Sequence, residues 1–179
     1  MSEEPRQRRS IELKARYDDR EKALRVLSRL GAEFLSTERQ TDSYFSVGSY
    51  RMKLRESSLG NHWLIGYSRP NEAGSRPSNC RLEAVPDPAE KKRILSRAMG
   101  VKAVVVKERT LYRLGFVRVH IDRVEDLGDF LEFEAVLEEG TDDAGAHARL
   151  EELRREFEIF EEDLIAGSYA DLARLESPT

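Results

Sequence analysis

Four short stretches of the sequence alternate charged and apolar residues, and all charged positions of a stretch share one parity. In a β-strand, side chains of one parity lie on one face. The stretches carry Glu12, Lys14 and Arg16; Arg51, Lys53 and Arg55; Arg118, His120 and Asp122; and Glu132 and Glu134. If these strands pair in one sheet, one face gathers guanidinium, ammonium and carboxylate groups, which can bind a polyanion together with a divalent cation.

The carboxylates Glu12, Asp122, Glu132 and Glu134 are the candidate metal ligands. They lie on the charged faces of the first strand and the last two strands. Mg²⁺ and Mn²⁺ prefer several oxygen ligands in octahedral geometry, some of them from substrate phosphate and water. A single Glu-x-Glu pair in a strand is usually an ordinary solvated face. The coincidence with Glu12 and Asp122 favours a metal site.

The basic residues of the same parity are candidate phosphate ligands. Arginine offers a bidentate fork to phosphate, and lysine offers a point charge. Several such groups around one site suit a triphosphate better than a monophosphate, although solubility and cross-strand pairing are expected to explain Arg51 and Arg113. We expect His120 to be structural and Tyr44, Trp63 and Tyr67 to belong to the core. The candidates are Lys14, Arg51, Lys53, Arg55, Arg81, Lys107, Arg109, Arg113 and Arg118.

Composition limits the classes of protein that the chain can represent. Its 179 residues suit one domain, and a net charge of −4 argues against a generally basic nucleic-acid binder. Cys80 is the only cysteine, so no intrachain disulfide can form, which suits a reducing cytoplasm. The polar start has no apolar leader, and no run approaches the roughly 18 apolar residues of a membrane helix. We expect residues 1–8 to form a flexible tail and 9–176 a single domain.

The pattern of strands and helices predicts an α+β fold built on a closed antiparallel sheet. Asp19, Asp87 and Ser168 are expected to cap helices, and residues 142–157 also have helical spacing. Short connections between about eight strands favour a sheet that closes into a barrel, with the helices on its apolar outside and the charged face inside. The expected strands are 9–17, 41–47, 50–56, 62–69, 80–85, 104–114, 116–124 and 130–138.

Several motifs together resemble the CYTH superfamily, also called the triphosphate tunnel metalloenzymes. The first is Ser10-Ile11-Glu12-Leu13-Lys14, which is similar to the family's E-x-E-x-K signature. The others follow in the family's order: Lys53-Leu54-Arg55, Arg81 with Glu83, Lys107-Glu108-Arg109, the run from Ile121 to Gly128, Phe130-Leu131-Glu132-Phe133-Glu134, and Ser168-Tyr169-Ala170-Asp171-Leu172. The resemblance covers about residues 9–175.

The resemblance implies an eight-stranded tunnel and a role for each matching residue. Glu12, Glu132 and Glu134, with Asp122 near them, would hold Mg²⁺ or Mn²⁺. A triphosphate would be gripped by Lys14, Lys53, Arg55, Arg81, Lys107 and Arg109. Lys14 would also assist proton transfer as the catalytic residue. The implied partner is a small-molecule triphosphate, with no nucleic acid and no membrane, and with a homodimer as one option in a cytoplasmic protein.

Two positions depart from the family pattern. Ser10 replaces the first glutamate of the signature, so one candidate metal ligand is absent. In Tyr67-Ser68-Arg69-Pro70, Ser68 occupies the place where the family often has lysine, and the neighbouring Arg69 has the opposite parity. These changes bear on the reaction that the chain would catalyse.

The sequence therefore leaves several functions open. The leading hypothesis is a metal-dependent enzyme most like the class IV adenylyl cyclases, which convert ATP to cyclic AMP and pyrophosphate. A triphosphatase for thiamine triphosphate, a nucleotide or inorganic tripolyphosphate would use the same tunnel. A phosphate-binding module without chemistry and a purely structural β domain are the alternatives of a different class.

Overall fold

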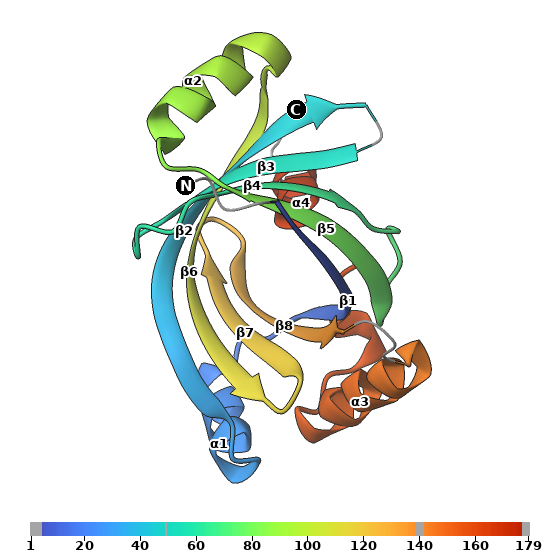
Figure 1. Cartoon of the computed structure of the whole chain (residues 1–179). Helices are drawn as coiled ribbons and strands as arrows, with labels where there is room; N and C mark the ends of the chain where they lie inside the picture. The colour runs from blue at the N-terminus through green and yellow to red at the C-terminus, as the bar shows by residue number, and fades with distance from the viewer. Residues whose placement is uncertain (1–4, 49, 139–141, 177–179) are drawn as a thin grey trace.

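The chain folds into one closed antiparallel β-barrel. A computed structural model describes residues 5–48, 50–138 and 142–176, and within them the strands pair in the order β1-β5-β4-β3-β2-β6-β7-β8 before β8 returns to β1 (Figure 1). This confirms the predicted architecture. The strands are β1 (Arg6–Arg16), β2 (Glu33–Val47), β3 (Tyr50–Ser57), β4 (Trp63–Ser68), β5 (Arg76–Ala84), β6 (Val101–Leu114), β7 (Val117–Val124) and β8 (Gly128–Leu137).

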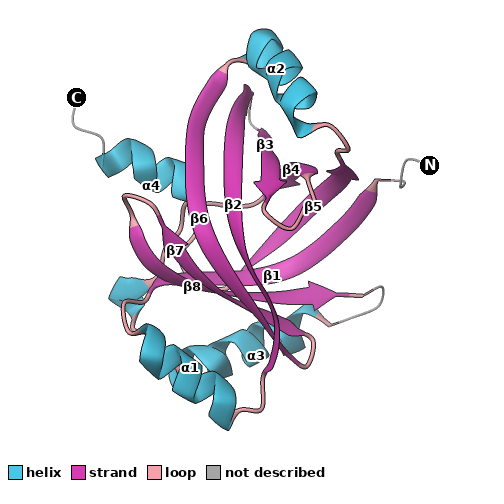
Figure 2. Cartoon of the chain, turned by 90° about the vertical axis from the view of Figure 1, so that its left-hand side faces the viewer, coloured by secondary structure: helices cyan, strands magenta, loops and turns pink. Residues whose placement is uncertain are grey.

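The helices lie outside the barrel, as expected. Figure 2 shows α1 and α3 together beneath β1, β7 and β8, while α2 lies at the opposite end of the molecule. Among the described residues, no helix is both long and apolar enough to cross a membrane. The helices are α1 (Arg20–Arg29), α2 (Pro88–Met99), α3 (Asp143–Glu156) and α4 (Tyr169–Glu176), with a 3₁₀ turn, η1 (Glu161–Asp163).

Helix boundaries follow the predicted caps. The Asp19 carboxylate accepts a hydrogen bond from the backbone N–H of Lys22, and the Asp87 carboxylate accepts one from that of Glu90. Pro88 occupies the first turn of α2, where its missing N–H costs nothing. These caps fix where α1 and α2 begin relative to the strands before them.

The alternation of β1 separates the main core from the barrel interior. Ile11, Leu13 and Ala15 are fully buried in an apolar cluster with residues of α1, α3, β7 and β8. Burial of each large aliphatic side chain contributes roughly 1.5–3 kcal/mol, so this outer cluster holds the sheet in its register. Glu12 and Lys14 therefore point the other way, into the barrel.

Five strands begin earlier than the sequence pattern predicted. β6 starts at Val101 rather than at residue 104, and β8 starts at Gly128 rather than at residue 130. β1 starts at Arg6, inside the expected tail; residues 1–4 of that tail lie outside the described residues. β2 starts at Glu33, and its pairing with β6 shifts between Phe34 and Ser36, where a bulge breaks the alternation. β5 starts at Arg76 rather than at residue 80. These earlier starts add inward-facing positions that the pattern did not identify.

Candidate functional site

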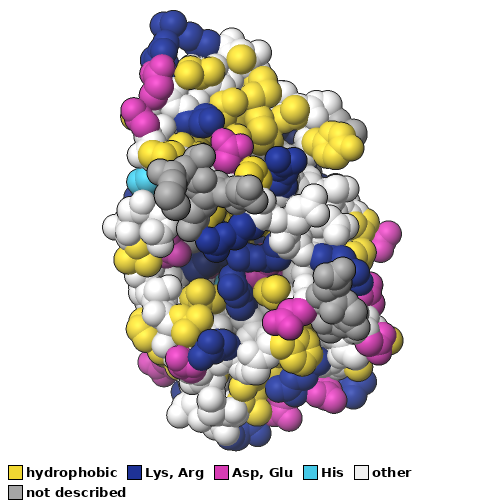
Figure 3. Space-filling model, viewed as in Figure 1, with side chains coloured by type: hydrophobic (Ala, Val, Ile, Leu, Met, Phe, Trp, Pro, Cys, Tyr) yellow, Lys and Arg dark blue, Asp and Glu magenta, His cyan; other side chains and the backbone are white. Residues whose placement is uncertain are grey.

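A charged pocket occupies the interior of the barrel. The cavity has a volume of about 290 Å³ and receives side chains from every strand, with Ser168 and Tyr169 added from the α4 end. Figure 3 shows Lys and Arg side chains gathered in the hollow at the centre of one face. Of the residues predicted to bind phosphate or metal, those that line the pocket are Glu12, Lys14, Lys53, Arg55, Lys107, Arg109, Arg118, Glu132 and Glu134.

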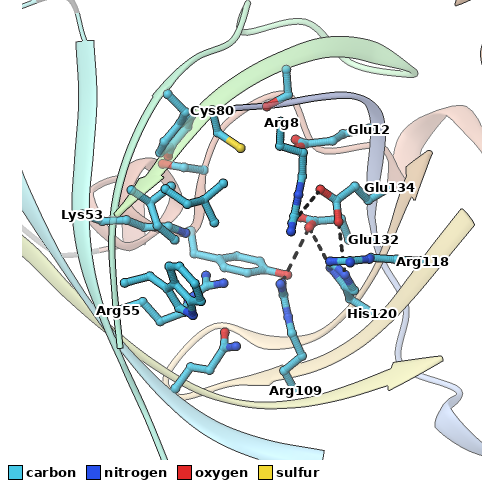
Figure 4. Close-up of a pocket in the computed structure, with 18 of the residues that line it drawn as sticks. Arg8, Glu12, Lys53, Arg55, Cys80, Arg109, Arg118, His120, Glu132 and Glu134 are labelled. Atoms are coloured by element: carbon cyan, nitrogen blue, oxygen red, sulfur yellow. Dashed lines mark hydrogen bonds and ion pairs between the residues drawn. The ribbon is translucent and has the colours of Figure 1, made fainter. Parts of the chain in front are cut away.

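One wall of the pocket is acidic. Figure 4 shows Glu12, Glu132 and Glu134 on one side, opposite Lys53 and Arg55. Barrel closure pairs β1 with β8 so that Glu12 lies directly opposite Glu134 in register. Directly opposed residues on neighbouring strands have Cβ atoms about 5 Å apart, so closure brings together carboxylates that are far apart in sequence.

Basic groups neutralise this acidic wall. Glu132 accepts a hydrogen bond from Lys14 Nζ at 2.9 Å, and its other oxygen lies 2.9 Å from Nδ1 of His120. Glu12 Oε2 accepts a bond of 3.0 Å from Arg69 Nη1. Burial alone would raise the pKa of Glu132, but Lys14, His120 and Arg109 outweigh it and hold the pKa well below its usual range.

Lys14 lies in the middle of the charged interior. Its ammonium group sits 4.0 Å from the centroid of the Tyr169 ring, and the residue is only 4% exposed. Burial lowers the pKa of Lys14 and outweighs the opposing effect of Glu132. The side chain is therefore a cation that gives up its proton more readily than a solvated lysine does.

The acidic wall offers donors of the type that a hard divalent cation requires. Glu12, Glu132 and Glu134 present six carboxylate oxygens to one cavity, which suits Mg²⁺ or Mn²⁺. Within the described part of the chain, no three His, Cys, Asp or Glu side chains are already gathered around a metal position. The donor set fits such an ion, and these carboxylates would exchange their present ion pairs for it.

The opposite wall is organised by Asp42, which sequence reasoning missed. This fully buried carboxylate accepts hydrogen bonds from Lys53 Nζ and Lys107 Nζ, both at 2.9 Å. It also accepts two from Arg55, at 2.8 Å from Nε and 2.7 Å from Nη2. One carboxylate thus holds three cations side by side, leaving an excess of positive charge at this wall.

The charges at this wall shift one another's pKa values. Burial alone would raise the pKa of Asp42, but Arg55, Lys107 and Lys53 hold it well below its usual range. Burial and then the neighbouring Arg55 lower the pKa of Lys53 to about 8. Burial also lowers the pKa of Lys107 well below its usual range. The free energy of holding these cations together would be offset by a bound polyanion.

Asp122 lies behind the pocket rather than in its lining. It is 1% exposed and accepts two hydrogen bonds from Arg109, at 2.7 Å from Nε and 2.6 Å from Nη2. Its second oxygen also accepts a bond of 2.6 Å from the Tyr169 hydroxyl. Asp122, predicted to be a metal ligand, therefore orients Arg109 and anchors the start of α4 through the hydroxyl of Tyr169.

The structure does not bring Arg81 to the pocket. On β5 the inward positions are Ser78, Cys80 and Leu82, so Arg81 is exposed on the outer face. Arg69 supplies a cation instead. Arg69 lies just past the end of β4 at Ser68 and keeps the parity of the inward-facing Tyr67; its side chain enters the pocket and is only 5% exposed.

Other pocket residues carried weak or misleading signals in the sequence. His120 was expected to be structural, yet it lines the pocket beside Glu132. Tyr44, Trp63 and Tyr67 were assigned to the core but also line the cavity. Asp42 shares its parity with Gln40 and Tyr44, which are inward positions of β2, so this alternation was the signal that could have identified it.

Ser10 keeps its inward position but provides no carboxylate. It is buried, and its hydroxyl lies 3.4 Å from Glu12 Oε1, to which it donates a weak hydrogen bond. The acidic wall therefore consists of three glutamates rather than four.

The fold is a closed antiparallel barrel, and its interior has cations on one wall and carboxylates on the other. These features define a tunnel-like barrel. The sequence matches the CYTH domain family over residues 8–169, so the chain belongs to that family. Proteins that it matches include two called putative adenylate cyclases, from Methanocaldococcus jannaschii and Vibrio parahaemolyticus.

Individual relatives extend over nearly the whole chain. "Putative adenylate cyclase MJ0240" from Methanocaldococcus jannaschii is 25% identical over 172 residues, covering 92% of this chain and 98% of the relative. The structure of the PH1012 protein from Pyrococcus horikoshii superimposes with a TM-score of 0.79 at 27% identity, covering 91% and 98%. HpAC1 from Hippeastrum, described as having a dominant triphosphatase activity, shares the fold with a TM-score of 0.64 at 16% identity, covering 95% and 97%.

Proposed function

We propose that this protein is a metal-dependent enzyme that acts on a nucleoside triphosphate inside the barrel, converting ATP to cyclic AMP and pyrophosphate. The observation that carries the proposal is the opposition of two charged walls across one cavity. The cations held by Asp42 would bind the phosphate chain, and the three glutamates would hold Mg²⁺ or Mn²⁺. The similarity to the Methanocaldococcus jannaschii relative supports the choice of ATP.

The reaction requires little covalent participation by the protein. The 3′-hydroxyl of the ribose attacks the α-phosphorus, a P–O bond forms, and pyrophosphate leaves with the electron pair of the broken bond. Lys53, Arg55 and Lys107 would stabilise the negative charge that develops on the leaving group. When bound, the divalent cation would supply further positive charge against the phosphate oxygens.

Lys14 is the residue that we propose to handle the proton of the attacking hydroxyl. Its ammonium group is 2.9 Å from Glu132 Oε2, so a proton can pass along this pair without crossing bulk water. Its lowered pKa brings it closer to the working range of a general acid or base. Tyr169 beneath the ammonium group limits where Lys14 can move.

An apolar patch at one end of the pocket favours a substrate with an organic group. Trp63 and Ile65 face inward on β4, directly opposite Arg55 and Lys53 on β3. Leu82 pairs with Ile65 from the other side. An aromatic ring beside aliphatic groups is suited to contact a nucleobase, whereas inorganic tripolyphosphate has no group to place there.

The products distinguish the proposed cyclase from a triphosphatase. Purified protein would be incubated separately with ATP, thiamine triphosphate and tripolyphosphate, each with Mg²⁺ or Mn²⁺, and the products separated by chromatography. We expect cyclic AMP and pyrophosphate from ATP. Orthophosphate without a cyclic product would replace the cyclase by a triphosphatase. Binding without any product would leave a phosphate-binding module.

Affinity for the triphosphate is expected to fall as pH rises through about 8. The pKa of Lys53 is about 8 in the folded protein, so this cation is lost at a pH where an ordinary lysine keeps its proton. Without metal, we expect the affinity for tripolyphosphate to fall about ten-fold between pH 7 and pH 9 if one proton is required. Calorimetric titration measures it.

The variant Lys53→Arg is the matched control because arginine keeps its charge throughout this range. Its pH profile should be flatter than that of the wild type, and equal slopes would contradict the assignment to Lys53. The effect on stability has the opposite sign. Because the folded pKa lies below the ordinary 10.5, the unfolded chain binds more protons between pH 8 and 10.5, so this residue's contribution to stability rises with pH.

A further inference from the structure

Three arginines converge at the α4 end of the barrel, beyond the pocket's opposed walls. Arg69 Nη2 donates to the carbonyl of Gly167 at 3.2 Å, and Arg76 Nη1 donates to that of Ile165 at 2.8 Å. Arg51 Nη2 lies 3.3 Å from Asp171 Oδ2. Side chains from β3, the β4–β5 loop and β5 therefore meet against a single segment, residues 165–171.

Other contacts place the same guanidinium groups close together. The guanidinium carbons of Arg51 and Arg69 lie 5.8 and 6.0 Å from the centroid of the Tyr67 ring. Arg76 pairs in register with Glu12, the carboxylate that Arg69 contacts. Burial, and then the nearby Arg69, lower the pKa of Arg76 to about 10. The three positive charges are thus near enough to repel one another.

The hydrogen-bonding capacity of this cluster is not used up. Buried nitrogens without a hydrogen-bond partner remain on all three residues, namely Arg51 Nη1, Arg69 Nε, Arg76 Nε and Arg76 Nη2. Arg76 is 1% exposed and donates only to backbone carbonyls, so no carboxylate balances its charge directly. Buried donors left unpaired cost free energy, and a buried unpaired charge costs more.

The charges of the cluster identify the missing partner as an anion. Three guanidinium groups face only two contacting carboxylates, those of Glu12 and Asp171, which leaves one excess positive charge. Arginine forks suit the several oxygens of a tetrahedral phosphate group. Of the three arginines, Arg69 also lines the main pocket, so it connects the cluster with that pocket at the end opposite Trp63.

We propose that Arg51, Arg69 and Arg76 form a second phosphate-binding subsite at the α4 end of the barrel. Its ligand is either the terminal phosphate of a chain longer than three phosphates or a separate orthophosphate. The first of these rests on the proposed function, because the rest of the chain would lie in the main pocket. The second does not depend on the reaction that the pocket catalyses.

Calorimetric titrations in EDTA test the subsite without turnover. Tetrapolyphosphate should bind wild-type protein at least about ten-fold more tightly than tripolyphosphate if the subsite takes the end of a longer chain. If it takes a separate ion, protein saturated with tripolyphosphate should bind one further orthophosphate. In either case, Arg51→Gln and Arg76→Gln should abolish the additional binding. Arg81→Gln, on the outer face of β5, should retain it.

Failure of the subsite is distinguishable from failure of the proposed function. If wild-type protein shows neither the preference for tetrapolyphosphate nor the further orthophosphate, or if both variants retain it, the subsite is refuted. If tripolyphosphate binds neither in EDTA nor with Mn²⁺, the proposed function fails, and orthophosphate titration of wild type against Arg51→Gln still decides the subsite. Arg76 donates hydrogen bonds to backbone carbonyls, so Arg76→Gln can disturb folding. If that variant does not fold, Arg51→Gln alone decides whether the subsite exists.

Discussion

Replacing Glu134 with glutamine is expected to lower kcat/KM for the triphosphate at least about 100-fold while the protein remains folded. Glutamine keeps the size of the side chain but removes the charge that faces Glu12 across the β1–β8 pair. The acidic wall would then have two charged glutamates rather than three, and would hold a divalent cation less well. The measurement is steady-state turnover over a range of Mn²⁺ concentrations, with circular dichroism as the test of folding.

Glu83→Gln is the matched control for this variant. Glu83 lies on β5 outside the pocket, and its carboxylate forms an ion pair of 3.4 Å with Lys91 of α2. It should retain wild-type turnover. Full activity in Glu134→Gln would refute the assignment of Glu134, and an equal loss in both variants would mean that charge alone, rather than position, matters.

Replacing Asp42 with alanine is expected to have the largest effect on stability. The substitution leaves Lys53, Arg55 and Lys107 without the carboxylate that they share. Removing one partner of a buried ion pair costs about 3–5 kcal/mol, because the remaining charges stay buried without compensation. Chemical denaturation of wild type and variant measures the difference in the free energy of unfolding.

A surface pair and a ligand supply the controls for Asp42. Asp129→Ala breaks an ion pair with Arg123, whose side chain is 62% exposed, and should cost at most about 1 kcal/mol. Tripolyphosphate should raise the melting temperature of Asp42→Ala more than that of wild type, because it replaces the lost negative charge. If Asp42→Ala were as stable as wild type, Asp42 could not be the group that assembles this wall.

The sequence predicted the barrel and much of its charged interior because alternation has a direct geometric meaning. On β1, β3, β7 and β8, charged residues alternate with apolar ones, and closure turns each charged face inward. Lys14, Lys53, Arg118 and Glu132 therefore lie where the alternation placed them.

The misplacements arise on β4 and β5, where apolar residues occupy inward positions. Arg69 has the parity of the inward-facing Tyr67, although it lies just past the end of β4. Arg81 has the opposite parity to the inward positions of β5, so its charge faces outward. Asp42 has the same parity as Glu38 on β2, but the nearest residues of that parity, at positions 40 and 44, are uncharged. Its importance depends on pairing with both β3 and β6, which a local pattern cannot provide.

The positions of a bound triphosphate and metal decide whether the two charged walls of the barrel form the active site. A crystal of the protein with Mn²⁺ and a nonhydrolysable ATP analogue, measured at a wavelength where manganese scatters anomalously, would locate both. We expect a manganese peak beside Glu132 and Glu134, with the phosphates between that peak and the cations held by Asp42. Phosphates bound outside the barrel, or manganese away from the acidic wall, would contradict it.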